Sequence, residues 1–192
     1  MTASPTPTTR TAQNATYQHK GRALSFISKP PAGLTRLFFR VPLWLFKRGL
    51  AWPLGNRIAR ITHRGRKSGR IRQTVVEVVR FDPRTREIVI MSAWQGKTDW
   101  YRNLQAAPAL EVRTGRVAYR PAQRLLDADE TYQEFRGYLR RHPWIARYIY
   151  PRIFGMAANF TPSELRAQVD ATFCGITFRP AGSAPPGWSQ SS

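Results

Sequence analysis

A short basic segment between two β-prone stretches constrains this chain more than any other feature. It occupies residues 61–74, with the sequence Ile-Thr-His-Arg-Gly-Arg-Lys-Ser-Gly-Arg-Ile-Arg-Gln-Thr. Gly65 and Gly69 accept positive φ angles, so the chain can reverse here and aim successive N–H groups at one point. The pattern predicts a β-hairpin with a cationic tip, which we call the basic hairpin.

The tip of the basic hairpin has the chemistry of an anion site. We expect its backbone N–H groups to form an anion-binding nest, with charge from Lys67 and Arg72 and a hydroxyl from Ser68. The alternative is a solvated turn that binds nothing in particular, since runs of charge usually face water. The spacing alone leaves both interpretations open.

The composition indicates a globular protein with an anionic partner. The chain has 192 residues, 42% of them hydrophobic, which suits one domain with a sizeable core. Its formal net charge of +20 would attract nucleic acid, anionic lipid or an anionic cofactor, without choosing between them. Cys174 is the only cysteine, so no intrachain disulfide can form, and we expect a reducing, cytoplasmic setting.

The two ends of the chain differ from its middle. Residues 1–30 are rich in Ser, Thr and Pro, residues 181–192 have a similar character, and we expect both to be disordered tails around one domain at 31–180. Residues 31–54 are predicted to form an amphipathic helical lead-in, hinged at Pro42 and too interrupted by charge to span a membrane. This lead-in either lies in a membrane interface or covers the domain's own core or ligand pocket.

The rest of the pattern predicts antiparallel strands with added helices. Asp127 and Thr161 are each followed three residues later by Glu, the capping-box spacing that marks a helix start, and Thr98 is expected to cap a shorter helix. Strands are predicted at 72–81, 87–92, 109–113, 116–124 and 172–178, after the one that enters the basic hairpin. Antiparallel strands with few crossovers indicate a small closed or partly closed barrel.

Motifs of several enzyme classes are missing from the sequence. The three histidines lack metal-ligand spacing, and Walker A and G-x-G-x-x-G loops are absent, so no metal site, ATPase or Rossmann dehydrogenase is expected. What remains is the basic hairpin, the polar strand end at Ser92 and the helix start at Asp99. Together these could line a cleft with phosphate at one end and a flat ring at the other. The aromatic residues nearby suit such a cleft and the protein core equally well.

In this arrangement the motifs resemble those of the deazaflavin-dependent nitroreductase family, which includes F420-dependent quinone and nitroimidazole reductases. The similarity runs from about residue 50 to residue 127, through Thr-x-x-Gly-Arg-Lys-Ser-Gly at 62–69, Met-Ser at 91–92, Asp-Trp-Tyr-Arg-Asn-Leu at 99–104 and Ala-Pro at 107–108. The resemblance implies a mainly β (α+β) split β-barrel of the flavin-reductase or FMN-binding type. It also implies coenzyme F420, an 8-hydroxy-5-deazaflavin that carries a phosphate and a polyglutamate tail.

Carried over position by position, the resemblance implies a cofactor site in three parts. The phosphate and anionic tail would be held by Arg66, Lys67, Ser68 and Arg72, and Gln73, Thr74 and Val75 would continue along the cofactor. The ring would be bordered by Ile90, Met91, Ser92 and Ala93, and the site would be closed by Asp99, Trp100, Tyr101, Arg102 and Asn103. The candidate catalytic residues are Ser92, as a hydrogen-bond partner of ring or substrate, and Tyr101, with either a nearby tyrosine or water as the proton donor. Tyr138, Tyr148 and Tyr150 are further candidates by location only.

The implied function is hydride transfer from reduced F420 to an electron-poor acceptor such as a quinone, an enone or a nitro compound. An alternative is a non-catalytic split-barrel protein that binds a lipophile such as a fatty acid. A third hypothesis is a membrane-surface protein in which residues 34–54 dock on anionic lipid, and it is compatible with the first if the acceptor is a membrane quinone. Nucleic acid is not expected, because no recognition motif accompanies the charge, and the sequence leaves monomer and homodimer open.

Overall fold

A computed structural model describes residues 52–149 and 160–191 of the chain. The predicted N-terminal tail, nearly all of the helical lead-in and Tyr150 lie outside the described residues. No helix in these two described ranges is long and apolar enough to cross a membrane.

Fifteen elements follow one another in the described part of the chain. In order they are η1 (Trp52–Arg57), β1 (Ile58–Arg64), β2 (Ile71–Asp82), β3 (Glu87–Ser92), η2 (Trp94–Gly96), α3 (Asp99–Ala106), β4 (Glu111–Thr114), β5 (Val117–Tyr119), β6 (Pro121–Leu125), α4 (Ala128–Arg141), η3 (Ile145–Ile149), α6 (Pro162–Thr172), β7 (Cys174–Pro180), η4 (Ala181–Ser183) and β8 (Ser189–Gln190). The basic hairpin is therefore formed as predicted, by β1, β2 and the turn at residues 65–70.

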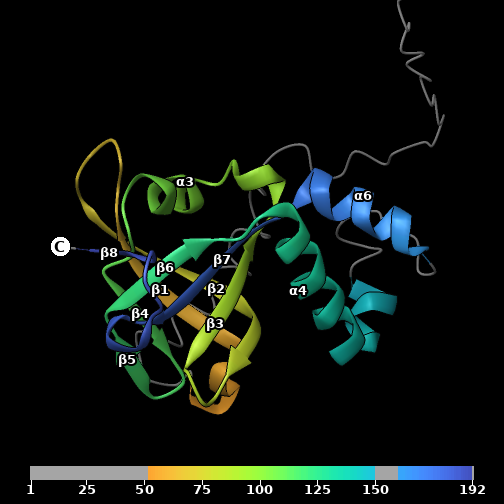
Figure 1. The fold of residues 1–192 in the computed structure, drawn as a ribbon, viewed down its shortest axis with the longest axis horizontal. Coiled ribbons are helices and arrows are strands. Elements are labelled where there is room, and N and C mark those ends of the chain that lie inside the picture. Colours follow the sequence, from red (N-terminus) through yellow and green to blue (C-terminus); the bar gives the residue numbers. More distant parts are fainter. Residues whose placement is uncertain (1–51, 150–159, 192) are drawn as a thin grey trace, which may run out of the picture.

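The strands form one antiparallel sheet in the order β5-β4-β1-β2-β3-β7-β6-β8. β5 and β6 lie toward opposite ends of this order, yet only Arg120 separates them in the chain. One short segment therefore connects the two sides of the sheet, which curls into a half-barrel (Figure 1). This arrangement confirms the predicted split-barrel fold, mainly β with helices.

The prediction of a single strand at 116–124 is wrong. β5 pairs with β4, where Tyr119 lies opposite Val112, whereas β6 pairs with β7, where Ala122 lies opposite Arg179. Pro121 has no N–H group to donate to a ladder, so proline favours a break at the start of a strand. The break lets the chain cross from one side of the half-barrel to the other.

β2 joins the two halves of the sheet from within. Its first half pairs with β1, its second half pairs with β3, and the register shifts between Val78 and Arg80. The shift means that β2 has one more residue than β3 over this step. Such a bulge bends a strand and increases its twist. The bend contributes to the curl of the sheet.

Two apolar cores lie on the two faces of the sheet. Inside the curl, Ile88 and Ile90 of β3 pack with β1, β4, β7 and α3. Val89 points the other way, into a core built mainly by α4 and α6, which lie beside each other along the flank of the sheet (Figure 1). β3 is therefore buried on both faces, as its apolar run predicts.

Two of the three predicted helix caps are confirmed. The Asp127 carboxylate accepts a hydrogen bond from the Glu130 backbone N–H at 2.8 Å, and Thr161 and Glu164 form the same reciprocal box at α6. Thr98 occupies the N-cap position of α3, but its side chain does not cap the helix. Its hydroxyl is used at the candidate site instead.

Residues 181–191, expected to belong to a disordered tail, are placed along the edge of the sheet. β8 pairs with β6, with Gln190 opposite Ala122. The Trp188 ring lies 5.7 and 5.6 Å from the guanidinium carbons of Arg124 and Arg179, within cation–π range. An aromatic residue that meets two cations supplies an anchor for this segment, which its composition does not reveal.

Candidate cofactor site

The turn of the basic hairpin is closed by its own backbone. The Gly65 N–H donates to the Arg70 carbonyl at 2.9 Å, and the Gly69 N–H donates to the Gly65 carbonyl at 2.8 Å. Gly69 has the predicted positive φ of 65°. Gly65 does not, so that part of the prediction is wrong.

Most N–H groups of the turn are not available for the predicted anion-binding nest. The N–H groups of Gly65 and Gly69 close the turn, that of Arg66 donates to the Asn103 side chain, and that of Arg70 lies 3.4 Å from the Ser68 hydroxyl. Four N–H groups of the turn are therefore used within the protein. An anion at this site would be bound mainly by side chains.

The side chains around Gly65 suit an anion. A methyl group at Gly65 would lie 3.0 Å from the Ser68 hydroxyl oxygen and 3.3 Å from the Arg72 Nε, so the missing side chain leaves a small cradle between a hydroxyl and a guanidinium. Lys67, Arg70 and Arg72 are exposed, and no acidic side chain in the described ranges forms an ion pair with them. This donor set fits a group with several negative charges, such as a phosphate with a polyglutamate tail.

Arg66 behaves differently from its cationic neighbours. Its guanidinium donates to the Asp99 carboxylate at 2.8 Å, to the Asp99 carbonyl and to the Asn103 side-chain oxygen at 2.9 Å. The Arg66 hydrogen bond holds the pKa of the Asp99 carboxyl below its ordinary value, with a further contribution from the Arg66 charge. Arg66 thus docks the hairpin turn on α3, with Asp99 and Asn103 as its partners.

The polar strand end at Ser92 is closed by a hydroxyl pair. Ser92 is 1% exposed, and its hydroxyl lies 2.8 Å from that of Thr98 and donates to the Ala93 carbonyl at 3.1 Å. Thr98 therefore ties the start of α3 to the end of β3 instead of capping the helix. The tie brings the strand end and the helix start together, as the predicted site requires.

The loop between Ser92 and Thr98 has an uncommon backbone. Trp94, Gln95 and Gly96 all have positive φ angles, of 58°, 51° and 66°. Glycine adopts this conformation readily, whereas Trp and Gln rarely do, and such strain tends to gather at functional sites. Sequence reasoning missed this feature, because only Gly96 signals it.

Tyr101, the candidate proton donor, lies in the core inside the curl. It is 5% exposed, it packs against Gly96, and its ring meets that of Trp100 edge-on at 5.9 Å. Burial raises the pKa of Tyr101 to about 12, with smaller contributions from Cys174. Its hydroxyl therefore stays protonated at neutral pH and is a weak acid.

The other predicted site residues lie on different faces of the sheet. Gln73 is exposed and Thr74 and Val75 are half-buried on β2, beside the basic hairpin. Ile90 faces the core inside the curl, whereas Met91 and Ala93 pack against the α4–α6 core, and Arg102 is exposed on α3. β3 therefore presents the residues predicted to border the ring to both faces of the sheet.

Tyr138 and Tyr148, the candidates near the end of α4, differ sharply in burial. Tyr138 is buried, donates a short hydrogen bond to the Glu77 carboxylate, and has its ring 4.8 Å from that of His142. Tyr148 is half exposed on η3. Tyr138 thus reaches β2 through Glu77, and the Tyr148 ring lies beside the guanidinium of Arg147.

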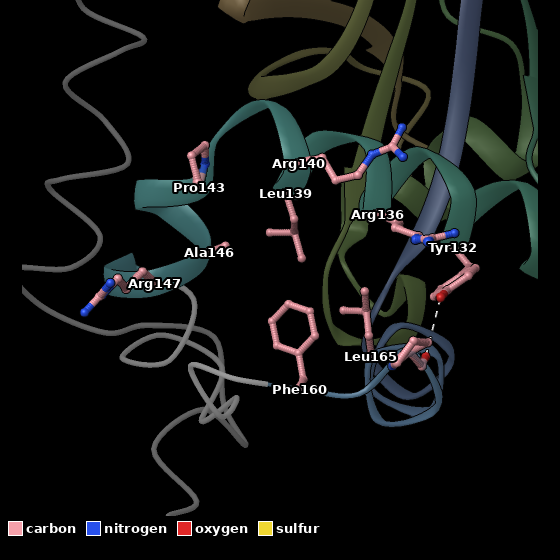
Figure 2. Close-up of a pocket in the computed structure, with 10 residues that line it drawn as sticks. Tyr132, Arg136, Leu139, Arg140, Pro143, Ala146, Arg147, Phe160 and Leu165 are labelled. Atoms are coloured by element: carbon pink, nitrogen blue, oxygen red, sulfur yellow. Dashed lines mark hydrogen bonds between the residues drawn. The ribbon is translucent and has the colours of Figure 1, made fainter.

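A cavity of about 600 Å³ lies between α4, η3 and α6, and none of these residues lines it. Figure 2 shows Leu139, Phe160 and Leu165 facing its interior, with the arginines Arg136, Arg140 and Arg147 around it. No residue predicted to bind the cofactor contributes to its lining. It is a separate apolar space with a cationic rim.

Comparison with known proteins identifies the family. No curated protein matches the chain. A solved F420-H2 dependent reductase (FDR-A) shares 18% identity, covering 65% of this chain and 96% of its own, with a TM-score of 0.44. An FMN-binding protein from Nostoc punctiforme, related to pyridoxamine 5'-phosphate oxidase, shares 14% identity over 80% of this chain and 82% of its own, with a TM-score of 0.38. These structures are too distant to assign a ligand.

The family model gives the assignment instead. The model of the F420H(2)-dependent quinone reductases matches residues 46–148, which is more than half of the chain. The matched range contains the basic hairpin, the end of β3 and α3. The chain therefore belongs to the F420H2-dependent quinone reductase family.

Proposed function

We propose that this protein is a reductase that uses reduced coenzyme F420, the cofactor of its family, to reduce a quinone. One observation carries the proposal: three exposed cations, Lys67, Arg70 and Arg72, lie in and beside the hairpin turn and form no ion pair with an acidic side chain of the described ranges, and the Arg72 guanidinium borders the cradle at Gly65. An F420 phosphate and its anionic tail would supply the missing negative charge. Enones and nitro compounds are secondary candidates, because they are also electron-poor.

The residues of the basic hairpin and α3 divide into two groups under this proposal. Lys67, Ser68 and Arg72 bind the anionic end of the cofactor directly. Arg66, Asp99 and Asn103 hold the turn against α3, because their polar atoms already bond to one another. This assignment changes the role of Arg66 from ligand binding to positioning.

Ser92, Thr98 and the strained loop form the other end of the proposed site. When bound, reduced F420 supplies a hydride, and reduction of a quinone to a hydroquinone also needs a proton. Tyr101 is buried and keeps its own proton at neutral pH, which favours water as the immediate proton donor. The half-buried Thr98 hydroxyl, held in place by Ser92, then serves to orient the ring edge or the acceptor. Contact of residues 34–54 with an anionic membrane would give access to a membrane quinone.

The cavity between α4, η3 and α6 favours a second candidate function. Apolar side chains facing inward and arginines at the rim suit a lipophile with an acidic head, such as a fatty acid. A protein that only carried such a molecule would not need the cations of the basic hairpin. We therefore rank it second.

An assay of reduced F420 oxidation by a soluble quinone tests the proposed function. The reaction is monitored by the absorbance of oxidised F420, which returns as the cofactor is oxidised. We expect the protein to accelerate quinone-dependent oxidation well above the rate without protein, and to do so less with a nitro compound. A protein that gives no acceleration, while native mass spectrometry shows a bound acyl lipid, would contradict the reductase and support the lipid carrier.

A further inference from the structure

His63 is a buried histidine that the site described so far does not use. It lies in β1 directly before the hairpin turn and is 2% exposed. In the β1–β2 ladder it lies opposite Arg72. Its Nδ1 atom lies 3.3 Å from the side-chain nitrogen of Asn103 on α3.

The hydrogen bonds around Asn103 define the protonation state of His63. The Asn103 Oδ1 atom accepts from the Arg66 backbone N–H at 3.1 Å and from its guanidinium at 2.9 Å. A backbone N–H can only donate, so the oxygen of the amide faces Arg66 and its NH2 group faces His63. Because an NH2 group also only donates, His63 Nδ1 must accept, and the imidazole is neutral with its proton on Nε2.

The charged groups around His63 reinforce this state. Burial lowers the pKa of His63 most, the Arg72 guanidinium lowers it further, and the Arg64 backbone opposes them. Arg66 and Asp99 lie beyond Asn103, already paired with each other. On β4, Glu111 and Arg113 are in register with Thr62 and Arg60, which point to the opposite face of the sheet from His63.

We propose that His63 is a positioning residue, whose neutral imidazole holds Asn103 so that Asn103 can dock the turn carrying Lys67, Ser68 and Arg72 on α3. Protonation of Nδ1 would set a donor against the Asn103 NH2 group. The amide would then have to rotate and lose its hydrogen bonds to Arg66, which would release the turn. Cofactor affinity therefore falls when His63 is protonated; this inference rests on the proposed function.

A simple charge effect predicts the reverse. A positive imidazole beside Arg72 would add to the cationic field and attract the anionic cofactor more strongly. We call the contact of His63 with Asn103, and of Asn103 with Arg66, the clamp. Loss of the clamp weakens cofactor binding as pH falls, whereas added charge strengthens it. The direction of the pH dependence therefore separates the two effects.

Calorimetric titration of F420 between pH 8.0 and 5.5 tests the inference on the full chain, on His63→Gln and on the control His142→Gln. Glutamine can present a neutral acceptor to Asn103 at every pH, while His142 lies at the end of α4, outside the clamp. With each Kd divided by its own value at pH 8.0, we expect the unchanged protein and His142→Gln to weaken progressively more than His63→Gln as the pH falls, by up to about 5-fold, as loss of a hydrogen bond of about 1 kcal/mol implies. The ionisation of F420 itself is common to all three proteins and cancels.

Two outcomes would overturn the inference alone: parallel profiles for the unchanged protein and His63→Gln, or tighter binding at low pH. Absence of F420 binding at pH 8.0 would instead contradict the proposed function, and the inference with it. Nitrogen-15 NMR of the unchanged protein provides a readout that needs no variant and no cofactor. We expect the neutral Nε2–H tautomer of His63 at pH 7, and an Nδ1–H tautomer would contradict the clamp.

Discussion

Replacement of Glu87 by alanine is expected to lower the free energy of unfolding by about 3 kcal/mol, the lower end of the range for breaking a buried ion pair. Glu87 is 8% exposed on β3, where it accepts from Arg80 at 2.6 Å, from Thr177 at 3.0 Å and from Arg179. The variant would leave two partly buried guanidinium groups facing an uncharged space. Arg80 keeps Glu134 as a partner, which is why we expect the lower end of the range.

The same carboxylate predicts a pH dependence. Burial alone raises the pKa of Glu87, but hydrogen bonds from Arg80 and Arg179 outweigh it and hold the pKa below the ordinary value of 4.5. The ionised form therefore stabilises the fold above that pH, and the stabilisation is lost as pH falls through the lowered pKa. Glu87→Gln should lose this part of the acid sensitivity.

Urea unfolding followed by circular dichroism measures both effects. Asp170→Ala is the control, because Asp170 pairs with Arg166 at the protein surface, where such a pair contributes about 0.5 kcal/mol or less. If Glu87→Ala lost no more stability than Asp170→Ala, the Glu87 network would not be a stabilising element of the fold.

Replacement of Gly96 by alanine is expected to have an effect of similar size, again about 3 kcal/mol, as the sum of two costs. A residue with a side chain in the left-handed region costs about 1–2 kcal/mol, and inserting a methyl group into a packed core costs about 1–3 kcal/mol. Gly96 meets both conditions, since its φ is 66° and a methyl group would lie 2.7 Å from the Tyr101 ring.

Gly69→Ala separates these two costs. Gly69 has nearly the same φ, 65°, but no atom lies within 4 Å of the position that a methyl group would take. We expect this variant to lose only the backbone part, about 1–2 kcal/mol, in the same unfolding experiment. Equal losses for Gly69→Ala and Gly96→Ala would show that Tyr101 does not pack closely on the loop.

Local sequence rules predicted the parts of the fold that depend on neighbours in the chain. The capping boxes at Asp127 and Thr161 depend on two residues three positions apart, and the buried run of β3 depends on composition alone. Trp188 shows the limit of such rules, because its partners Arg124 and Arg179 come from distant strands. The tail that contains it has the composition of a disordered segment.

The candidate site divides in the same way. The basic hairpin, the strand end at Ser92 and the start of α3 follow from local patterns, and the Ser92–Thr98 pair links the latter two. The role of Arg66 depends on Asn103, 37 positions away, and could not be inferred from spacing. A side chain at position 65 would fill the cradle and crowd Ser68 and Arg72, and only the folded turn reveals this constraint on Gly65.

Titration of F420 tests most directly whether the basic hairpin is a cofactor site. The purified protein is compared with Lys67→Ala, Arg72→Ala and Arg84→Ala under the same conditions. Arg84 is an exposed arginine in the turn between β2 and β3, so its variant removes one charge without touching the basic hairpin. We expect micromolar or tighter binding, weakened about 10-fold or more in the Lys67 and Arg72 variants, as loss of a charge-assisted hydrogen bond of about 1.5–3 kcal/mol implies. Arg84→Ala should bind nearly as the unchanged protein does. Failure of the unchanged protein to bind F420, or equal affinities in all four proteins, would contradict a cofactor site at the basic hairpin.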